Sequence, residues 1–331
     1  MSIEPFKKIK VTPIADESFG VRSMCTYVET PDVKVLADPG VSLGQRFALL
    51  PHVKEYKAIK ECREKIAAFA EKAEVLTISH YHFDHYTPTF TDFTWNWSSL
   101  DVARQIYQDK IVLTKAIRSN INISQRRRGW MLKKTAGSVM KRVEDADGKS
   151  FSFGDTELSF SKPVFHGEEG TPLGWVLMLN VKCEDEKVVH ASDVQGPVFS
   201  STLEIILSEK PQLVFIGGPP LYLVGFRVSQ QAIESGIENL RMLVENTSMT
   251  VIEHHLLRDQ GWRVFSKPVF DAAEKSKHLA LTAAEFLGEP NNFLEYRRRE
   301  LYKEYPPDES FIKWTKLPRM KQRQEPPPLE G

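Results

Sequence analysis

The chain has 331 residues, and its 44 Lys and Arg balance 44 Asp and Glu, so the formal net charge is zero with neutral His. The protein therefore has no overall positive field that would attract nucleic acid or an anionic membrane, although this composition is compatible with a local basic patch. With 41% hydrophobic and 27% charged residues, the composition is typical of a soluble globular protein with one large core or two modest ones.

The cysteines and the absence of long apolar runs indicate the cellular compartment in which we expect the protein. Cys25, Cys62 and Cys183 are odd in number and widely spaced, which argues against a disulfide framework and favours a reducing compartment. Residues 1–8 lack the apolar core of a signal peptide, and no apolar run approaches membrane-spanning length. We expect a cytoplasmic protein that does not bind a membrane, and the sequence does not indicate its oligomeric state.

The first third of the chain predicts three strands and a helix. Residues 7–14, 21–29 and 33–37 have strand patterns, and the third ends at an Asp-Pro-Gly turn that begins with Asp38. Apolar residues at helical spacing predict an amphipathic helix over 51–73. On this evidence alone Asp38 could be a plain turn carboxylate.

A dense group of metal-binding residue types follows the next predicted strand, 75–78. Three imidazoles and a carboxylate occupy six positions there: His80, His82, Asp84 and His85. Alternate side chains of an extended chain share a face, which brings His80 and His82 together, while a turn can direct Asp84 and His85 to a second point. Imidazole combined with carboxylate suits Zn²⁺ first, and Fe or Mn next. We predict two adjacent metal positions.

This His-x-His-x-Asp-His run resembles the signature of the metallo-β-lactamase superfamily. The resemblance implies an α/β fold, an αβ/βα four-layer sandwich, which holds two divalent metal ions at one edge of its paired sheets. It implies a further His, an Asp and a last His as ligands at strand ends. It also implies that Asp38 lies behind the ligands and orients them by hydrogen bonding.

Two segments after this run each have two interpretations. The aromatic residues are either local core or the lining of a substrate cleft: Phe90, Phe93, Trp95 and Trp97. Residues 119–134 form either an exposed charged helix face or an anion-binding insert, because Arg126 and Arg128 can make bidentate contacts with phosphate or carboxylate.

Two later strands deliver the next candidate ligands. The strand pair over 151–165 ends at His166, and the strand over 187–191 ends just before Asp193. A single His is weak evidence, and Asp193 could merely cap a helix over 198–207. The resemblance makes His166 a ligand and Asp193 the carboxylate between the two metals. His190 lies on the opposite face of its strand from Asp193, where we expect a core or supporting residue.

The last ligand has two candidates at the end of the strand over 249–252. We prefer His254, because residues 250–254 repeat the cadence of 76–80. His255 could instead donate a proton to a leaving group. In the Gly- and Pro-rich loop after the strand over 213–216, Tyr222 is a candidate to polarise a substrate oxygen.

The C-terminal part predicts a helix over 229–245 and a final helix over 266–287, followed by a basic, proline-rich extension. Such composition is commonly a loosely ordered segment that packs on the domain or on a partner. We therefore divide the chain into a metallo-β-lactamase-like domain, 1–288, with a helical and basic insert at about 87–150, and an extension, 289–331.

Carried across residue by residue, the resemblance assigns His80, His82 and His166 to one metal and Asp84, His85 and His254 to the other, with Asp193 between them. A metal-bound hydroxide would then attack an electrophile. Asp84 or Asp193 could take the proton of the water, and His255 could protonate the leaving group.

The expected function is a metal-dependent hydrolase that acts on a phosphoric ester, a small molecule or a nucleic acid. One alternative is a hydrolase of lactones, thioesters or other acyl compounds. Another is a metalloprotein without hydrolytic activity, such as a redox di-iron protein, a sensor or a scaffold. The stretches 120–129 and 217–228 resemble a mainly archaeal, functionally uncharacterised branch of the superfamily, which informs the fold more than the substrate.

Overall fold

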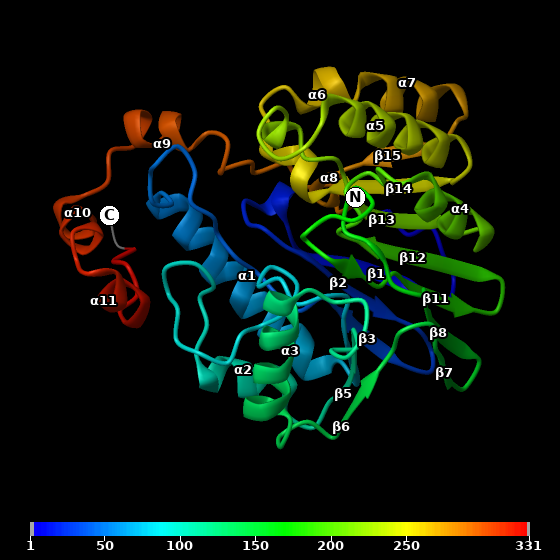
Figure 1. Ribbon diagram of the computed structural model, residues 1–331, viewed down its shortest axis with the longest axis horizontal. Helices are drawn as coiled ribbons and strands as arrows, with labels where there is room; N and C mark the ends of the chain where they lie inside the picture. Colours follow the sequence, from blue (N-terminus) through cyan, green and yellow to red (C-terminus); the bar gives the residue numbers. More distant parts are fainter. Residues whose placement is uncertain (1–2, 330–331) are drawn as a thin grey trace.

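The computed structural model of the chain describes residues 3–329. Two β-sheets pack face to face, and helices cover the outer face of each, so the layers run helix, sheet, sheet, helix (Figure 1). The predicted αβ/βα four-layer sandwich is confirmed. Among residues 3–329, no helix combines the length and the apolar character needed to cross a membrane.

The first sheet has six strands in sequence order, antiparallel from β1 to β3 and parallel from β3 to β6. Its strands are β1 (Lys10–Asp16), β2 (Met24–Glu29), β3 (Lys34–Ala37), β4 (Val75–Ile78), β5 (Ile111–Thr114) and β6 (Arg142–Asp145). The predicted insert, about 87–150, therefore contributes two strands of this sheet as well as helices.

The second sheet has seven strands in the order β15-β14-β13-β12-β11-β8-β7, parallel from β12 to β15 and antiparallel elsewhere. Its strands are β7 (Ser150–Phe153), β8 (Thr156–Phe160), β11 (Leu179–Cys183), β12 (Glu186–Ser192), β13 (Leu213–Gly217), β14 (Met249–Glu253) and β15 (Leu279–Leu281). A separate hairpin pairs β9 (Val164–Phe165) with β10 (Trp175–Val176).

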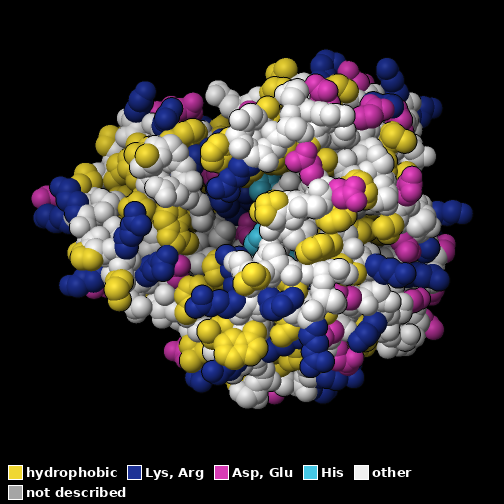
Figure 2. All heavy atoms as spheres, in the orientation of Figure 1, with side chains coloured by type: hydrophobic (Ala, Val, Ile, Leu, Met, Phe, Trp, Pro, Cys, Tyr) yellow, Lys and Arg dark blue, Asp and Glu magenta, His cyan; other side chains and the backbone are white. Residues whose placement is uncertain are grey.

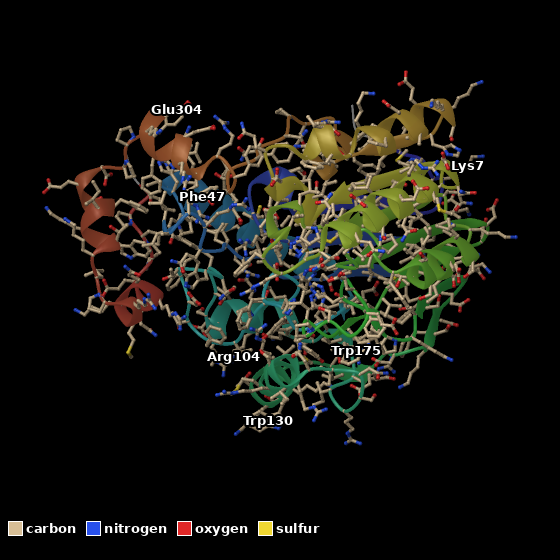
Figure 3. All side chains as sticks on the ribbon, turned by 45° about the horizontal axis from the view of Figure 1, so that its top comes forward. Lys7, Phe47, Arg104, Trp130, Trp175 and Glu304 are labelled. Carbon is tan, nitrogen blue, oxygen red and sulfur yellow. The ribbon has the colours of Figure 1, made fainter. Side chains whose placement is uncertain are left out.

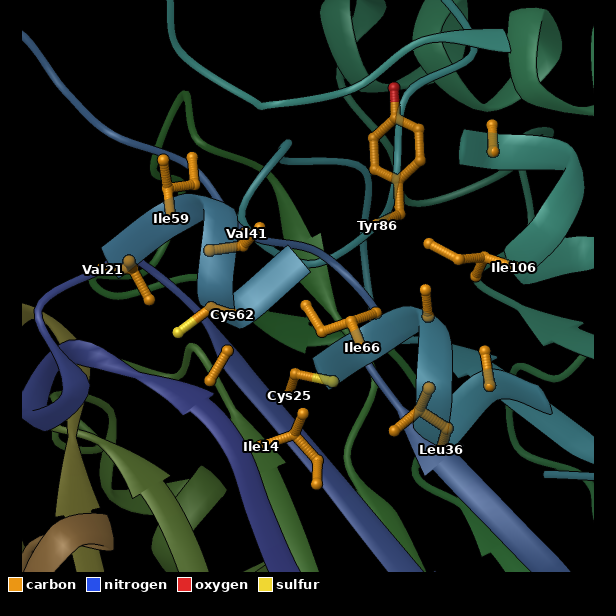
Figure 4. Packing of buried hydrophobic residues seen from close by; sticks show 14 of the residues in the cluster. Ile14, Val21, Cys25, Leu36, Val41, Ile59, Cys62, Ile66, Tyr86 and Ile106 are labelled. Carbon is orange, nitrogen blue, oxygen red and sulfur yellow. The ribbon is translucent and has the colours of Figure 1, made fainter. Parts of the chain in front are cut away.

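Three apolar cores join these layers. The inner core lies between the sheets and includes Val35, Leu158 and Phe215. Over the first sheet lie α1 (Val53–Lys72), α2 (Leu100–Tyr107) and α3 (Ile123–Ala136), and over the second lie α4 (Ser200–Ser208), α5 (Gln230–Glu245) and α7 (Lys267–Lys275). All three cysteines are buried free thiols, and Cys25 and Cys62 pack in the core beneath α1 (Figure 4).

The strand ends explain where a site can form. The parallel strands β3 and β4 end just before Asp38 and the residues 79–85. In the second sheet, β12 and β14 run parallel through β13 and end just before Asp193 and His254. The carboxyl ends of parallel strands form the edge of a sheet where open α/β folds place their ligands. The packing of the two sheets brings both edges together.

The predicted final helix over 266–287 is wrong. Instead, α7 ends at Lys275, β15 follows, and α8 (Ala283–Phe286) comes next. Lys277 takes a left-handed conformation with a φ of 59°, which ends helical continuation. The chain then pairs β15 in parallel with β14, because this edge of the sheet offers unpaired backbone groups.

The composition of the extension did not determine whether it is ordered, and the part described is helical. It forms α9 (Arg298–Glu304), α10 (Glu309–Thr315) and α11 (Arg319–Gln324). Phe311 and Trp314 pack against Tyr56 of α1, and Arg298 forms an ion pair with Glu55 in which both side chains are fully buried. The predicted packing on the domain is confirmed, since the extension shares the core over the first sheet.

The buried ion pair makes a testable prediction. In Arg298→Ala the Glu55 carboxylate stays buried without its partner, which costs about 3–5 kcal/mol. We expect the free energy of unfolding, measured by urea denaturation, to fall by that amount. The control is the neighbouring Arg297→Ala, whose exposed pair with Glu300 contributes less than about 1 kcal/mol. Equal losses in the two variants would contradict the assignment.

Candidate metal centre

The first group of donor atoms consists of three imidazoles and one carboxylate. His80 Nε2 lies 3.1 Å from His82 Nδ1, and His166 Nε2 lies 3.2 Å from the same nitrogen. Asp193 Oδ2 lies 2.9 Å from His166 Nε2. One donor atom from each of these four residues lies within 4.8 Å of all the others. Three nitrogens and one oxygen form a donor set that suits zinc.

The second group lies beside the first and shares its carboxylate. Asp84 Oδ2 is 3.6 Å from His254 Nε2, and Asp84, His85 and His254 have donor atoms within 4.8 Å of one another. Asp193 Oδ2 is 3.3 Å from His254 Nε2 and 3.8 Å from His85 Nε2. Asp193 therefore contacts both groups, as expected for a carboxylate between two positions. It does not cap α4, whose N-cap residue is Phe199.

Two unpaired polar atoms test whether a cation fits. His85 Nε2 and Asp193 Oδ1 are buried and have no hydrogen-bond partner among residues 3–329. Such atoms are rare in proteins because losing water without a replacement is costly. Both belong to the donor groups, and a divalent cation would satisfy both. The residues present therefore fit the metal centre that the fold implies.

Asp38 lies behind the two groups and accepts hydrogen bonds from three different segments. Its Oδ1 accepts from the Ser79 backbone N–H at 2.8 Å, and its Oδ2 accepts from the Ser79 hydroxyl at 2.6 Å and the Ser192 hydroxyl at 2.7 Å. His85 Nδ1 lies 2.9 Å from the same oxygen. A donated Nδ1–H leaves His85 Nε2 facing the metal position, which is the orienting role expected of Asp38.

Sharp backbone turns aim these side chains. Asp38, Ser192 and His254 have φ values of 47°, 54° and 65°, in the left-handed region that residues other than Gly seldom adopt. Asp38 and His254 directly follow strands and Ser192 ends one, so the change in backbone direction falls at the strand ends that carry the donor groups. Such strain is concentrated at functional sites.

The charge states suit a cation. Burial lowers the pKa of His82 and of His254, each to about 3, and lowers the pKa of His80 well below its ordinary value. Burial alone would raise the pKa of Asp193, but the neighbouring imidazoles outweigh it and lower that pKa well below the usual range. Neutral imidazoles and ionised carboxylates are the forms that bind metal.

Asp84 and His85 complete the electrostatic arrangement. His85, His254 and Arg258 overcome the effect of burial and lower the pKa of the Asp84 carboxyl. Burial lowers the pKa of His85, but its hydrogen bond to Asp38 and the nearby carboxylates raise it above the ordinary value. A cation that binds His85 would therefore have to displace a proton that this raised pKa helps the imidazole to retain.

His255 lies at the edge of the centre. Its Nε2 is 3.3 Å from Asp193 Oδ2, and its Nδ1 is 2.8 Å from the Tyr222 hydroxyl. It shares Asp193 with His254, but only His254 also groups with Asp84 and His85. The geometry therefore places His254 where the last ligand was predicted and His255 where a second donor or a proton carrier would lie.

The centre opens into a cavity of about 940 Å³ whose lining includes His82, Asp84, His166, Asp193 and His255. Figure 2 shows histidines at the bottom of a hollow in this face, with lysine and arginine side chains around it. Of the predicted substrate-binding residues, Arg128 and Tyr222 line the cavity. Arg126 is exposed and does not, so the prediction of a contact with a substrate in this cavity fails for Arg126.

The aromatic segment divides between the two interpretations. Phe90 and Trp95 line the cavity, whereas Phe93 and Trp97 pack edge to face against each other. His190 is buried and its Nε2 donates to the Met24 carbonyl, so its predicted place in the core is confirmed.

Three residues of the centre were not predicted. Ser192 donates to Asp38, the Gln195 side chain lies 3.1 Å from His166 Nδ1, and Arg258 lies 3.0 Å from His254 Nδ1. Ser192 and Gln195 flank Asp193, and Arg258 follows His254 by four residues. Proximity in sequence was the one available signal, because the contacts arise only from the fold.

Comparison with known proteins agrees with this description. No family model matches the chain. It is 47% identical over 294 residues to a UPF0282 protein of Methanopyrus kandleri, a match that covers 88% of this chain and 99% of that protein. It is 44% identical over 295 residues to a UPF0282 protein of Methanocaldococcus jannaschii, which covers 88% and 96%.

A likeness to a solved structure concerns the fold alone. The metallo-β-lactamase fold protein YhfI of Bacillus subtilis superposes with a TM-score of 0.53 and 13% identity, over 86% of this chain and 98% of that chain. The four-layer fold of this chain is therefore the metallo-β-lactamase fold.

The buried imidazoles predict how stability depends on pH. Unfolded histidines take up protons below about pH 6.5, whereas folded His82 and His254 stay neutral down to a pKa of about 3. The unfolded state thus binds more protons in this window, and we expect the metal-free protein to lose stability as the pH falls through it. The raised pKa of His85 acts in the opposite direction, but it is one group.

The measurement is the free energy of urea unfolding with a chelator present at a series of pH values. His82→Gln should show a pH dependence smaller by up to about one proton, because one depressed imidazole is gone. An identical pH dependence in the two proteins would count against the burial argument.

Proposed function

The chain belongs to the UPF0282 family, and from its donor geometry and its arginine-lined cavity we propose that it is a metal-dependent hydrolase of phosphoric esters. The observation that carries the proposal is that residues of both donor groups line one cavity: His82, Asp84, His166 and Asp193. A substrate in that cavity would lie against the donor atoms.

The metal ions would be held by the two groups around Asp193. His80, His82, His166 and Asp193 would hold one, and Asp84, His85, His254 and Asp193 would hold the other. Zn²⁺ is the preferred ion, with Fe or Mn next, because nitrogen donors are combined with carboxylate. When bound, divalent cations supply an activated water and stabilise negative charge that develops on the substrate.

The protein residues would manage protons. Neighbouring imidazoles, together with Arg258 beside Asp84, lower the pKa of both carboxyls, so Asp84 and Asp193 are ionised. An ionised carboxylate is the form that would accept the proton of an attacking water. His255 borders the cavity, with the Tyr222 hydroxyl at its Nδ1 and Asp193 at its Nε2. That position suits a donor to the leaving group.

Arginine residues favour a phosphoric ester. Arg128 and Arg227 both line the cavity, and neither forms an ion pair among the residues described. Arg128 belongs to α3, a helix with no Asp or Glu, so nothing on that helix neutralises it. Guanidinium groups bind phosphate oxygens bidentately. Trp130, on the same helix, points outward into solvent (Figure 3) and does not line the cavity.

Apolar side chains in the same wall favour a second candidate. Leu43, Phe83 and Leu223 line the cavity together with Phe90 and Trp95. Such a lining would also accept an acyl compound, a lactone or a thioester, with the same metal chemistry.

The deciding experiment is metal analysis followed by substrates assayed side by side. A chromogenic phosphodiester should be hydrolysed faster than a chromogenic acyl ester, and chelation should abolish the activity until metal is restored. Faster acyl hydrolysis would select the second candidate. Redox-active iron without hydrolysis of either substrate would exclude both hydrolase candidates and favour the non-hydrolytic metalloprotein.

Arg128→Ala tests phosphate recognition. Loss of a charge-assisted contact costs about 1.5–3 kcal/mol, so we expect kcat/KM for the phosphodiester to fall by about tenfold to a hundredfold, with little change for the acyl ester. Arg126→Ala removes the same charge two residues away without altering the cavity wall, and serves as the control. An equal loss for both substrates would show that Arg128 supports the structure rather than the phosphate.

His255→Ala tests the proton donor. A general acid contributes about a hundredfold or more, so kcat should fall by that amount while the metal content stays unchanged. The control, His278→Ala, alters an imidazole that bonds to the Val244 carbonyl away from the centre. Full turnover at full metal content would remove His255 from this role, and loss of metal would identify it as a ligand.

A further inference from the structure

The two donor groups differ because a buried guanidinium lies against only one of them. Arg258 lies in the 3₁₀ helix η3 (His254–Arg258), and its side chain is 2% exposed. Its Nη2 is 3.0 Å from His254 Nδ1, 3.4 Å from His254 Nε2 and 3.8 Å from Asp84 Oδ2. The guanidinium therefore contacts two of the three residues of the second group.

The remaining contacts of Arg258 hold it in place. Its Nε donates to Glu17 Oε2 at 2.8 Å, and its Nη1 lies 3.2 Å from both the Tyr222 hydroxyl and His255 Nδ1. An arginine stays charged at every pH at which proteins are folded. The second group thus has a permanent positive charge at close range, only partly offset by Glu17.

No guanidinium or ammonium group among the described residues touches the first group in this way, although Arg128 lines the cavity and its charge acts on His82. Within residues 3–329, no lysine or arginine forms a hydrogen bond or ion pair with His80, His82, His166 or Asp193. Repulsion between a guanidinium and a divalent cation a few ångströms apart is strong in a buried site, since the effective dielectric constant there is far below that of water. A cation in the second group would meet this repulsion, and one in the first group would meet much less of it.

From these contacts we propose that the two positions have unequal affinity. One divalent ion binds tightly at His80, His82, His166 and Asp193, and Arg258 makes the position at Asp84, His85 and His254 the weaker one. Asp84 and the shared Asp193 still attract a cation there, so the second position is weakened rather than abolished. This inference rests on the proposed metal centre but not on the identity of the substrate.

The test is a Zn²⁺ titration of the metal-free full chain in competition with a chromophoric chelator. The wild type should show two steps, the second at least about tenfold weaker than the first. Asp84→Asn should remove the weak step and keep the tight one, whereas His82→Ala should remove the tight step. Two equal steps in the wild type, or loss of the tight step in Asp84→Asn, would overturn the inference.

A paired substitution isolates the role of Arg258. The double variant Arg258→Gln/Glu17→Gln removes both charges of the pair, so that Glu17 is not left buried alone, and should bring the second step to within about threefold of the first. The matched control, Arg22→Gln/Glu295→Gln, removes another arginine–glutamate pair beside the cavity that does not contact the donor groups. This control variant should still bind Zn²⁺ in two unequal steps.

The outcomes separate this inference from the proposed function. Unequal binding steps in a protein that hydrolyses no ester would support the inference and remove the hydrolase. Equal binding steps in a protein that hydrolyses the phosphodiester would overturn the inference and support the hydrolase. An unchanged inequality in the Arg258→Gln/Glu17→Gln variant, provided that it folds with the same circular dichroism spectrum, would overturn the role of Arg258. Should that variant not fold, the Asp84→Asn and His82→Ala titrations decide.

Discussion

The hydrogen bonds to the Asp38 carboxylate are the interaction on which the rest of the centre depends. This side chain is buried between the sheets, and it accepts from Ser79 after β4, from Ser192 at the end of β12, and from His85. A buried carboxylate without such donors would be very costly, so the two sheets are held in a fixed relation to each other. The same bonds set the orientation of His85.

Burial and the neighbouring groups together set the charges of the donors. Burial keeps His80 neutral, whereas the imidazoles around Asp193 outweigh burial and keep that carboxylate ionised. The result is a site with basic nitrogens, anionic oxygens and two unpaired buried atoms. Arg258 breaks the symmetry of this arrangement by adding one fixed positive charge on the side of Asp84.

The walls of the cavity are held by close packing rather than by long flexible loops. A Cβ atom on Gly129 of α3 would lie 2.6 Å from the Tyr81 ring, so only glycine lets the helix that carries Arg128 approach the metal-binding segment. On another side, the Phe93 N–H donates to the Arg323 carbonyl, and Arg323 also lines the cavity. The C-terminal extension thus contributes to the wall directly.

The His-x-His-x-Asp-His run after a strand indicated a metal site by itself, because alternate side chains of an extended segment share a face. The fold and the later candidates His166, Asp193 and His254 came from the resemblance of that run to a known family, since a single His or Asp is weak evidence. The structure groups all of these residues at one edge. The sequence could not determine Arg258, Ser192 and Gln195 as members of the centre, nor separate His254 from His255, because those relations are distances across elements. The strand β15 and the helices of the extension also depended on tertiary packing, since an unpaired sheet edge and the apolar face of α1 stabilise segments whose own sequences have weak preferences.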